Sequence, residues 1–214
     1  PITWFTSGGW FRGLTRGHEL KNVMVRMRQF SVEADPNASL RISRKMVAGK
    51  IRNQRTLLMR NHVEPTAAAV KRLKMAVDSD VPDVSSREAL MGMEGAAAAL
   101  YFQLFGGMLK KGDETSEEFV FRLDKRNRRP PRDPVNALLS LSYSLLAKDC
   151  TIAAASVGLD PWVGFLHQPR FGRPALALDV MEEFRPLVAD SAVITAINNG
   201  TFEETDFVGA GDAV

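Results

Sequence analysis

One stretch constrains the fold more than any other part of the sequence. Residues 89–109 contain a single charged side chain, Glu94, among 21 residues. A membrane span needs about 20 predominantly apolar residues, but this stretch is rich in Ala and Gly, which add little to membrane insertion, and it contains Gln103. We therefore expect a helix that is buried inside the protein, and no association with a membrane.

The flanks of this stretch carry helix signals. Ser85 followed by Glu88 predicts a capping box at the helix start, and Gly106-Gly107 predicts its end. A 3.6-residue apolar period and similar end signals continue through most of the chain from about residue 19. They predict further helices over residues 40–60, 65–77, 135–148, 149–158 and 174–197, with a turn over residues 78–84.

The start of the chain has a different pattern. Residues 2–5 and 10–14 are short, rich in β-forming side chains and separated by a Ser-Gly-Gly sequence, which predicts a β-hairpin. An isolated hairpin is marginally stable, so we expect it to belong to a larger β domain. The predicted fold is mainly α: residues 1–18 are the tail of an N-terminal β domain, and residues 19–214 form a multi-helix domain with the candidate catalytic residues.

Composition excludes several classes of protein. Apolar residues make up 45% of the 214 residues and charged residues 25%, which is typical of a globular protein. The single cysteine, Cys150, excludes a disulfide framework and a cysteine zinc finger, and fits a reducing, cytoplasmic location. No H-E-x-x-H, G-x-S-x-G or Walker motif is present, which excludes zinc proteases, α/β-hydrolases and P-loop proteins.

The charge is unevenly distributed along the chain. Residues 1–60 carry 12 Lys and Arg against 3 Asp and Glu, whereas residues 61–214 carry 16 against 22. Residues 41–60 hold seven basic residues and no acid. The basic face of this helix consists of Arg41, Arg44, Lys45, Arg52 and Arg55. Nothing local neutralises this face, so we expect it to bind a phosphate backbone; a solvated surface is the alternative.

Glu94 is the first candidate for chemistry. It lies in the second turn of the apolar helix. An ionised carboxylate buried without a partner costs on the order of several kcal/mol. The alternatives are a structural salt bridge, a protonated acid or a bound metal ion.

More candidates lie towards the C-terminus. His167 ends the apolar run 162–166, where a histidine is more often structural than a ligand. Asp179 and Glu182 are three residues apart and share a helix face, while Glu183 points about 100° away from Glu182. Two carboxylates and a histidine from separate helices suit Mg²⁺ or Mn²⁺; an ordinary solvated acidic face is the alternative.

Arg170 and Arg173 lie between the histidine and the acidic helix. Arginines beside a metal site and near a helix N-terminus are suited to hold a phosphate. A solvated loop is the alternative, and the sequence does not distinguish the two.

Several segments of the chain resemble one known family. They are residues 50–54 with 57–58, residues 93–95 with 101–102, the run RRPPRDPVNALLS at 128–140, GFLH at 164–167, and GRPALALDVMEEFRP at 172–186. These motifs are long, ordered and family-specific. The chain resembles the CRISPR-associated integrase, Cas protein one of the spacer-acquisition complex, over nearly its whole length.

The resemblance implies a site and an activity. It places the ligands of one divalent metal ion, Mg²⁺ or Mn²⁺, on Glu94, His167 and Glu182, with Asp179 next to the metal and Tyr143 near the site. It implies a metal-dependent DNA endonuclease and integrase, which inserts spacer DNA at the repeat array by transesterification. The basic helix and the 125–132 loop, which includes Arg128 and Arg129, would then hold the DNA backbone without reading bases.

The resemblance also implies partners. These are DNA, as spacer precursor and CRISPR repeat, a second copy in a homodimer, and a dimer of Cas protein two that bridges two such homodimers. Only the last hairpin of the family's β domain is present, so we expect a C-terminal fragment. Two other functions fit the residues: a non-catalytic helical DNA-binding protein whose acids form salt bridges, and a metal-dependent repair nuclease with the same site.

Overall fold

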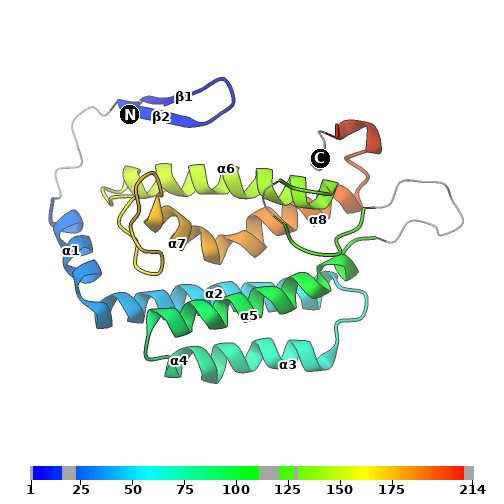
Figure 1. Ribbon diagram of the computed structural model, residues 1–214, viewed down its shortest axis with the longest axis horizontal. Coiled ribbons are helices and arrows are strands. Elements are labelled where there is room, and N and C mark those ends of the chain that lie inside the picture. Colours follow the sequence, from blue (N-terminus) through cyan, green and yellow to red (C-terminus); the bar gives the residue numbers. More distant parts are fainter. Residues whose placement is uncertain (1, 16–22, 111–120, 128–129, 210–214) are drawn as a thin grey trace, which may run out of the picture. The chain divides into compact units, whose positions relative to one another are not determined.

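The computed structural model describes residues 2–15, 23–110, 121–127 and 130–209. Over these ranges the chain is mainly helical, with one two-stranded sheet near its start (Figure 1). The predicted fold class is therefore confirmed. The predicted boundary between residues 18 and 19 lies outside the described residues, as do Arg128 and Arg129.

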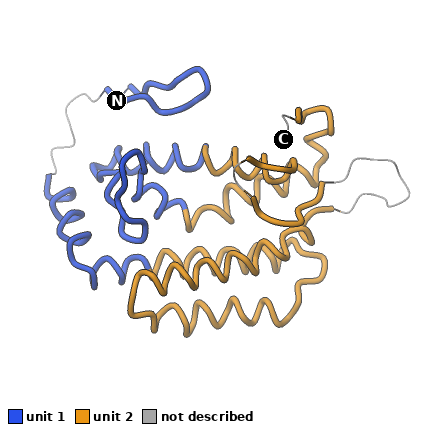
Figure 2. The backbone as a smooth tube through the Cα atoms, in the orientation of Figure 1, with its two compact units in different colours: residues 1–43, 145–181 blue, residues 44–144, 182–214 orange. Residues whose placement is uncertain are grey.

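The chain divides into two compact units, shown in blue and orange in Figure 2. Unit 1 consists of residues 1–43 and 145–181, and unit 2 of residues 44–144 and 182–214. Three helical segments pass from one unit into the other: α2 (Pro36–Asn61), α6 (Pro134–Ser156) and the run that begins with α7 (Ala175–Phe184). Each unit therefore contains parts of the same long helices.

Unit 1 begins with the β-hairpin. Strand β1 (Ile2–Phe5) pairs antiparallel with β2 (Phe11–Thr15), with a register shift between Trp4 and Phe5. The predicted hairpin is thus confirmed, with its second strand starting one residue later than expected.

Helix α1 (Val23–Ala34) is tied to the loop after α6 by one buried side chain, Gln29. The Gln29 amide donates to the backbone oxygens of Asp160 and Val163 and accepts from the Asp160 N–H, each at 2.8 Å. The buried amide is therefore satisfied on both its donor and acceptor sides.

Cys150 lies in the apolar core of unit 1, where it packs with Ala177 and Met181 of α7. Burial raises the pKa of its thiol to about 11. The thiol is protonated at neutral pH and packs as a small apolar group, so this cysteine is no candidate for a nucleophile.

Unit 2 contains the apolar helix, α5 (Arg87–Phe105), which lies beside α2 and α3 (Ala67–Met75) in Figure 1. Its buried side chains are seven, four and four residues apart, as expected of one buried face. They are Leu90, Ala97, Tyr101 and Phe105. The predicted helix is present, but it is buried on one face only: Met91, Gly95 and Gln103 are exposed. Among the described residues no helix has the length and apolarity that a bilayer crossing requires.

The start of α5 differs by one residue from the prediction. Ser86, not Ser85, is the N-cap, and its Oγ accepts a hydrogen bond from the Ala89 N–H at 3.2 Å. The third helical position is therefore Ala89 rather than Glu88, so a single capping bond replaces the predicted box.

The predicted turn at residues 78–84 is wrong. A π-helical turn (Ala76–Asp80) continues α3 and leads into the short helix α4 (Val81–Asp83). Pro82 lies in the first turn of α4, where the N–H that proline lacks has no intrahelical partner. The proline is thus compatible with a helix at this place.

Helix α6 is one continuous helix, although the sequence predicted two, at residues 135–148 and 149–158. Neither Gly nor Pro interrupts it. It ends at Ser156; two residues later Gly158 has a φ of +86°, and the Leu159 N–H bonds the Ala154 oxygen at 3.0 Å. This is a Schellman ending, which favours glycine at the positive φ.

The last predicted helix, residues 174–197, contains a π-helical turn. Helix α7 leads into this turn (Arg185–Asp190), which leads into α8 (Ser191–Asn198). Pro186 lies near the start of the turn; in a regular α-helix it would clash with the preceding turn, and the wider π turn accommodates it. Short 3-10 turns follow at Gly106–Met108, after α5, and at Glu204–Asp206, after α8.

Candidate metal centre

Two of the predicted ligands converge on one positive charge in unit 2. The ammonium of Lys50, on α2, forms ion pairs with Glu94 Oε1 on α5 and with Glu182 Oε2, which lies 2.5 Å from it at the end of α7. Lys50 is 4% exposed and Glu182 is 3% exposed. The expectation that Glu94 has a partner is confirmed, and in this structure the partner is a lysine.

Lys50 was not among the predicted site residues. On α2 the buried side chains Val47, Ile51 and Leu58 define an apolar face. Lys50 lies three residues after Val47, on that same face, and Gln54 follows four residues later and is also buried. A lysine on the apolar side of an otherwise basic helix is the signal in the sequence that this charge has a buried partner.

Arg185 fixes the other oxygen of Glu182. Its guanidinium lies 3.0 Å from Glu182 Oε1 and stacks over the Tyr143 ring, 5.0 Å from the ring centroid. Arg126 lies over the same ring at 5.4 Å. Tyr143, predicted to be near the site, is thus linked to Glu182 through Arg185.

Asp190 anchors this tyrosine from the π-helical turn. The Tyr143 hydroxyl donates to Asp190 Oδ1 at 2.6 Å, and the Tyr101 hydroxyl of α5 donates to Asp190 Oδ2 at 2.9 Å. Burial raises the pKa of the Asp190 carboxyl to about 6, although both tyrosine hydrogen bonds lower it. Burial, together with the Asp190 charge, raises the pKa of both tyrosines well above the usual value, so both are neutral donors at pH 7.

The raised pKa of Asp190 predicts that the free energy of unfolding falls as pH rises and this carboxyl loses its proton. The folded-state pKa of about 6 exceeds the ordinary 3.8, so the protonated form stabilises the fold fully below pH 3.8, and that stability is lost as pH rises through 6. At 1.36 kcal/mol per pKa unit the loss is about 3 kcal/mol in total, of which about 2 kcal/mol falls between pH 4.5 and 7. We expect Asp190→Asn to remove this part of the pH dependence in urea unfolding; equal slopes for both proteins would contradict it.

His167 and Asp179 form a second cluster, in unit 1. Asp179 is fully buried, and its Oδ1 lies 2.7 Å from His167 Nδ1. The same carboxylate accepts backbone N–H bonds from Phe165 and Leu166, at 2.5 and 2.9 Å, and from His167, at 2.9 Å. Asp179 is therefore a positioning residue: it holds the loop and, through Nδ1, the imidazole of His167.

Gly164 lets this loop approach α7 closely. A Cβ at this position would lie 2.7 Å from the Ala175 carbonyl carbon and 2.7 Å from Asp179 Oδ2. Those neighbours are backbone and a buried carboxylate, which have no room to move. The glycine that opens the GFLH segment is thus required by packing.

Helix α7 separates its adjacent glutamates by burial. Glu182 is buried against Lys50, whereas Glu183 is exposed. The Asn53 amide of α2 donates to the Glu183 backbone oxygen at 2.9 Å, so α2 and this part of the chain are in direct contact. Because adjacent side chains point about 100° apart on a helix, only Glu182 faces Lys50.

The predicted DNA-binding residues differ in their surroundings. Arg41, Lys45 and Arg52 are exposed on α2, while Arg55 is half-buried. Arg44 already has a partner within the protein, because its guanidinium donates a hydrogen bond to the Val84 backbone oxygen. In the loop before α7, Arg170 is exposed and Arg173 is half-buried.

The carboxylates of Glu94 and Glu182 lie around one ammonium, that of Lys50. No group of three or more His, Cys, Asp and Glu side chains that could hold a metal is found among the described residues. However, Glu94 and Glu182 supply the hard oxygen donors that Mg²⁺ and Mn²⁺ prefer. The Lys50 ammonium marks the place where they hold a cation.

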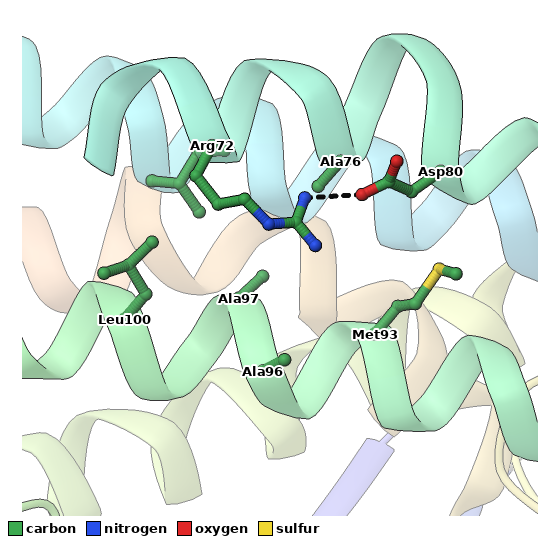
Figure 3. A pocket seen from close by; sticks show the side chains of 8 residues that line it. Arg72, Ala76, Asp80, Met93, Ala96, Ala97 and Leu100 are labelled. Atoms are coloured by element: carbon green, nitrogen blue, oxygen red, sulfur yellow. Dashed lines mark hydrogen bonds and ion pairs between the residues drawn. The ribbon is translucent and has the colours of Figure 1, made fainter. Parts of the chain in front are cut away.

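A small pocket lies elsewhere in unit 2, between α3 with its π-helical turn and α5 (Figure 3). Arg72 and Asp80 form an ion pair at 2.5 Å on one side, and Met93 and Leu100 line the other. Its volume is about 40 Å³, which is too small for a nucleotide. None of the predicted site residues lines it.

Comparison with known proteins assigns the chain to a family. The whole chain, residues 1–214, matches the family model described as CRISPR associated protein Cas1. A similar curated protein is a CRISPR-associated exonuclease Cas4/endonuclease Cas1 fusion from Geobacter sulfurreducens, 50% identical over 213 residues. That match covers 97% of this chain and 38% of the relative.

Solved structures show the same likeness. A chain of a partial Cas6-RT-Cas1–Cas2 complex has a TM-score of 0.80 and 30% identity, covering 96% of this chain and 60% of that one. A casposase bound to an integration product has a TM-score of 0.72 and 28% identity, covering 99% and 57%. The chain therefore spans less than two thirds of the length of each of these proteins.

Proposed function

The chain belongs to the CRISPR-associated protein Cas1 family, and from this premise we propose that the full protein is a metal-dependent DNA endonuclease and integrase of CRISPR adaptation. The observation that carries the proposal is the convergence of Glu94 and Glu182 on one cation position. The name of the Geobacter relative, which includes an endonuclease, supports the nuclease activity. The casposase bound to an integration product supports strand transfer.

We propose Glu94 and Glu182 as metal ligands, with His167 as the third. His167 is suited to this role because Asp179 holds its imidazole through Nδ1. A bound Mg²⁺ or Mn²⁺ would polarise a phosphoryl oxygen and stabilise charge on the attacking or leaving oxygen. Arg185 holds Glu182 Oε1, so that Oε2 is directed to the cation position.

The chain's own side chains would also bind and orient DNA. In integration, a DNA 3′-hydroxyl attacks a phosphodiester and another 3′-oxygen leaves. Arg173 would steady the charge on the phosphoryl group, while Arg41, Lys45 and Arg52 would hold the backbone. The likeness to a chain of a complex that contains Cas2 supports Cas2 as a partner; a homodimer, and a Cas2 dimer that bridges two of them, complete the proposed assembly.

An assay of the full-length protein tests this function. With Cas2, labelled spacer DNA and a plasmid that carries a repeat array, we expect strand joining with Mn²⁺ or Mg²⁺ and none with a chelator. DNA cleavage without joining would favour a repair nuclease instead.

One observation favours a non-catalytic alternative. Lys50 and Arg185 together balance the charges of Glu94 and Glu182, which is how the acids of a purely structural DNA-binding protein would be paired. The two functions differ in whether a metal ion replaces the lysine between the carboxylates.

The exposed basic residues of α2 give a prediction about DNA binding. We expect the triple substitution of Arg41, Lys45 and Arg52 by Gln to weaken binding to all duplex sequences alike, because these side chains would bind phosphates. For each phosphate that is no longer neutralised, the slope of log K against log salt should fall by about 0.9 for duplex DNA. Fluorescence anisotropy at several salt concentrations measures the slope, and an unchanged slope would mean that the face is only solvated.

A further inference from the structure

The loop between His167 and α7 presents one aromatic ring to solvent. The relative exposure of Phe171 is 109%. Its neighbours Arg170 and Arg173 form an antiparallel bridge, in which the Arg173 N–H donates to the Arg170 oxygen at 3.0 Å. Gly172 has a φ of +72°, which favours glycine at the third position of a tight turn. The turn therefore holds the ring outwards.

The base of this loop is anchored. Phe165 and Leu166 are buried, and their N–H groups bond the buried carboxylate of Asp179. At the other side of the loop, the Leu176 N–H donates to the Pro161 oxygen at 2.9 Å. The backbone of an anchored loop loses little conformational freedom when a ligand binds to it.

The surroundings of the ring indicate its partner. Phe171 lies in the chain between two arginines, of which Arg170 is exposed. An aromatic ring beside cations is the combination that binds single-stranded nucleic acid, because the ring stacks on a base and the cations contact phosphates. A protein partner would require an apolar patch, and the residues beside the ring on this turn are Arg and Gly.

We propose that Phe171 stacks on a terminal or unpaired base of the bound DNA. This inference rests on the proposed function, in which DNA strand ends are joined. Phe171 lies four positions after His167, a span of at most about 14 Å, or about four steps at 3.4 Å per nucleotide. The stacked base thus lies near the strand end that reacts. The ring has no hydrogen-bonding group, so the stacking is independent of base identity.

The test compares two DNAs with the full-length protein: a blunt duplex, and the same duplex with a short unpaired 3′ end that carries 2-aminopurine. We expect Phe171→Ala to weaken binding of the unpaired end roughly tenfold and to abolish the change in 2-aminopurine fluorescence, with a much smaller effect on the blunt duplex. Phe171→Trp keeps an aromatic face and should retain both signals.

Phe171→Leu separates stacking from apolar docking. It keeps an apolar side chain without a ring, so it should behave as Phe171→Ala does; full retention of binding would overturn the proposal in favour of a protein or other apolar contact. Phe30→Ala removes an exposed ring on α1 and should change the binding of neither DNA. If the wild type joins DNA and Phe171→Ala binds both DNAs as tightly as the wild type, only the stacking proposal fails. If the wild type binds neither DNA, the proposed function fails.

Discussion

Glu182→Gln should lower metal-dependent cleavage and joining of DNA by roughly 10²- to 10⁴-fold, since a metal ion contributes several kcal/mol to the transition state and 1.36 kcal/mol is a factor of ten. Glu182 is buried and directs Oε2 to the cation position. The amide keeps the shape of the side chain but lacks the anionic oxygen that a hard cation needs.

Glu183→Gln is the matched control. It changes the next residue in the same way, but that side chain is exposed and lies against Gly49 of α2, whereas the ion pairs of Lys50 are with Glu94 and Glu182. Its activity should stay within a few-fold of the wild type, because an exposed acid contributes little.

Two measurements accompany the activities. Calorimetric Mn²⁺ titration should show binding to wild type and Glu183→Gln and no binding to Glu182→Gln. Circular dichroism checks that both variants fold, since the Gln amide also faces the positive charges of Lys50 and Arg185. The opposite pattern, with no metal binding in Glu183→Gln and intact binding in Glu182→Gln, would reject the assignment on this helix.

The helices were predictable because burial leaves a period in the sequence. The apolar stretch with one charge, Glu94, defined α5, and no glycine or proline breaks α6. The π-helical turns were not predictable from that period, because one wider turn leaves the apolar spacing on either side unchanged. Pro186 was the local indication of the second one. The N-cap was misplaced by one residue because Ser85 and Ser86 are chemically identical candidates.

The partners of the site residues could be predicted only in part from the sequence. The need for a partner at Glu94 follows from the free energy of burying a charge. The identity of that partner does not, because Lys50 lies 44 residues away on another helix and only the packing of α2 on α5 brings them together. Spacing also places Asp179 and Glu182 on one face. Their roles differ because the backbone N–H groups of residues 165–167 donate hydrogen bonds to the Asp179 carboxylate.

The largest expected effect on stability comes from Lys50→Gln in the metal-free protein. Two carboxylates, one buried and the other with a 23% exposed side chain, share this single ammonium. Removing one partner of a buried pair costs about 3–5 kcal/mol. Part of that cost is screened by water at Glu94, and Glu182 keeps its ion pair with Arg185, so we take the lower value. At about 2–4 °C per kcal/mol for a chain of this size, the melting temperature should fall by about 6–12 °C.

Lys45→Gln is the matched control for this measurement. It removes the same charge from the same helix, five residues earlier, at an exposed position. Surface substitutions of this kind change stability by less than about 0.5 kcal/mol. A similar fall in both variants would mean that the destabilisation reflects general charge on α2 and not the buried pair.

Added Mn²⁺ then decides between the metal enzyme and the structural salt bridge. A ligand that binds only the folded state stabilises it in proportion to the logarithm of its concentration over its Kd. Without the competing ammonium the two carboxylates should bind Mn²⁺ more tightly, so the metal should raise the melting temperature of Lys50→Gln by more than that of the wild type. If Mn²⁺ leaves the melting temperature of Lys50→Gln unchanged, the position between Glu94 and Glu182 belongs to the lysine, and the non-catalytic DNA-binding function becomes the better explanation.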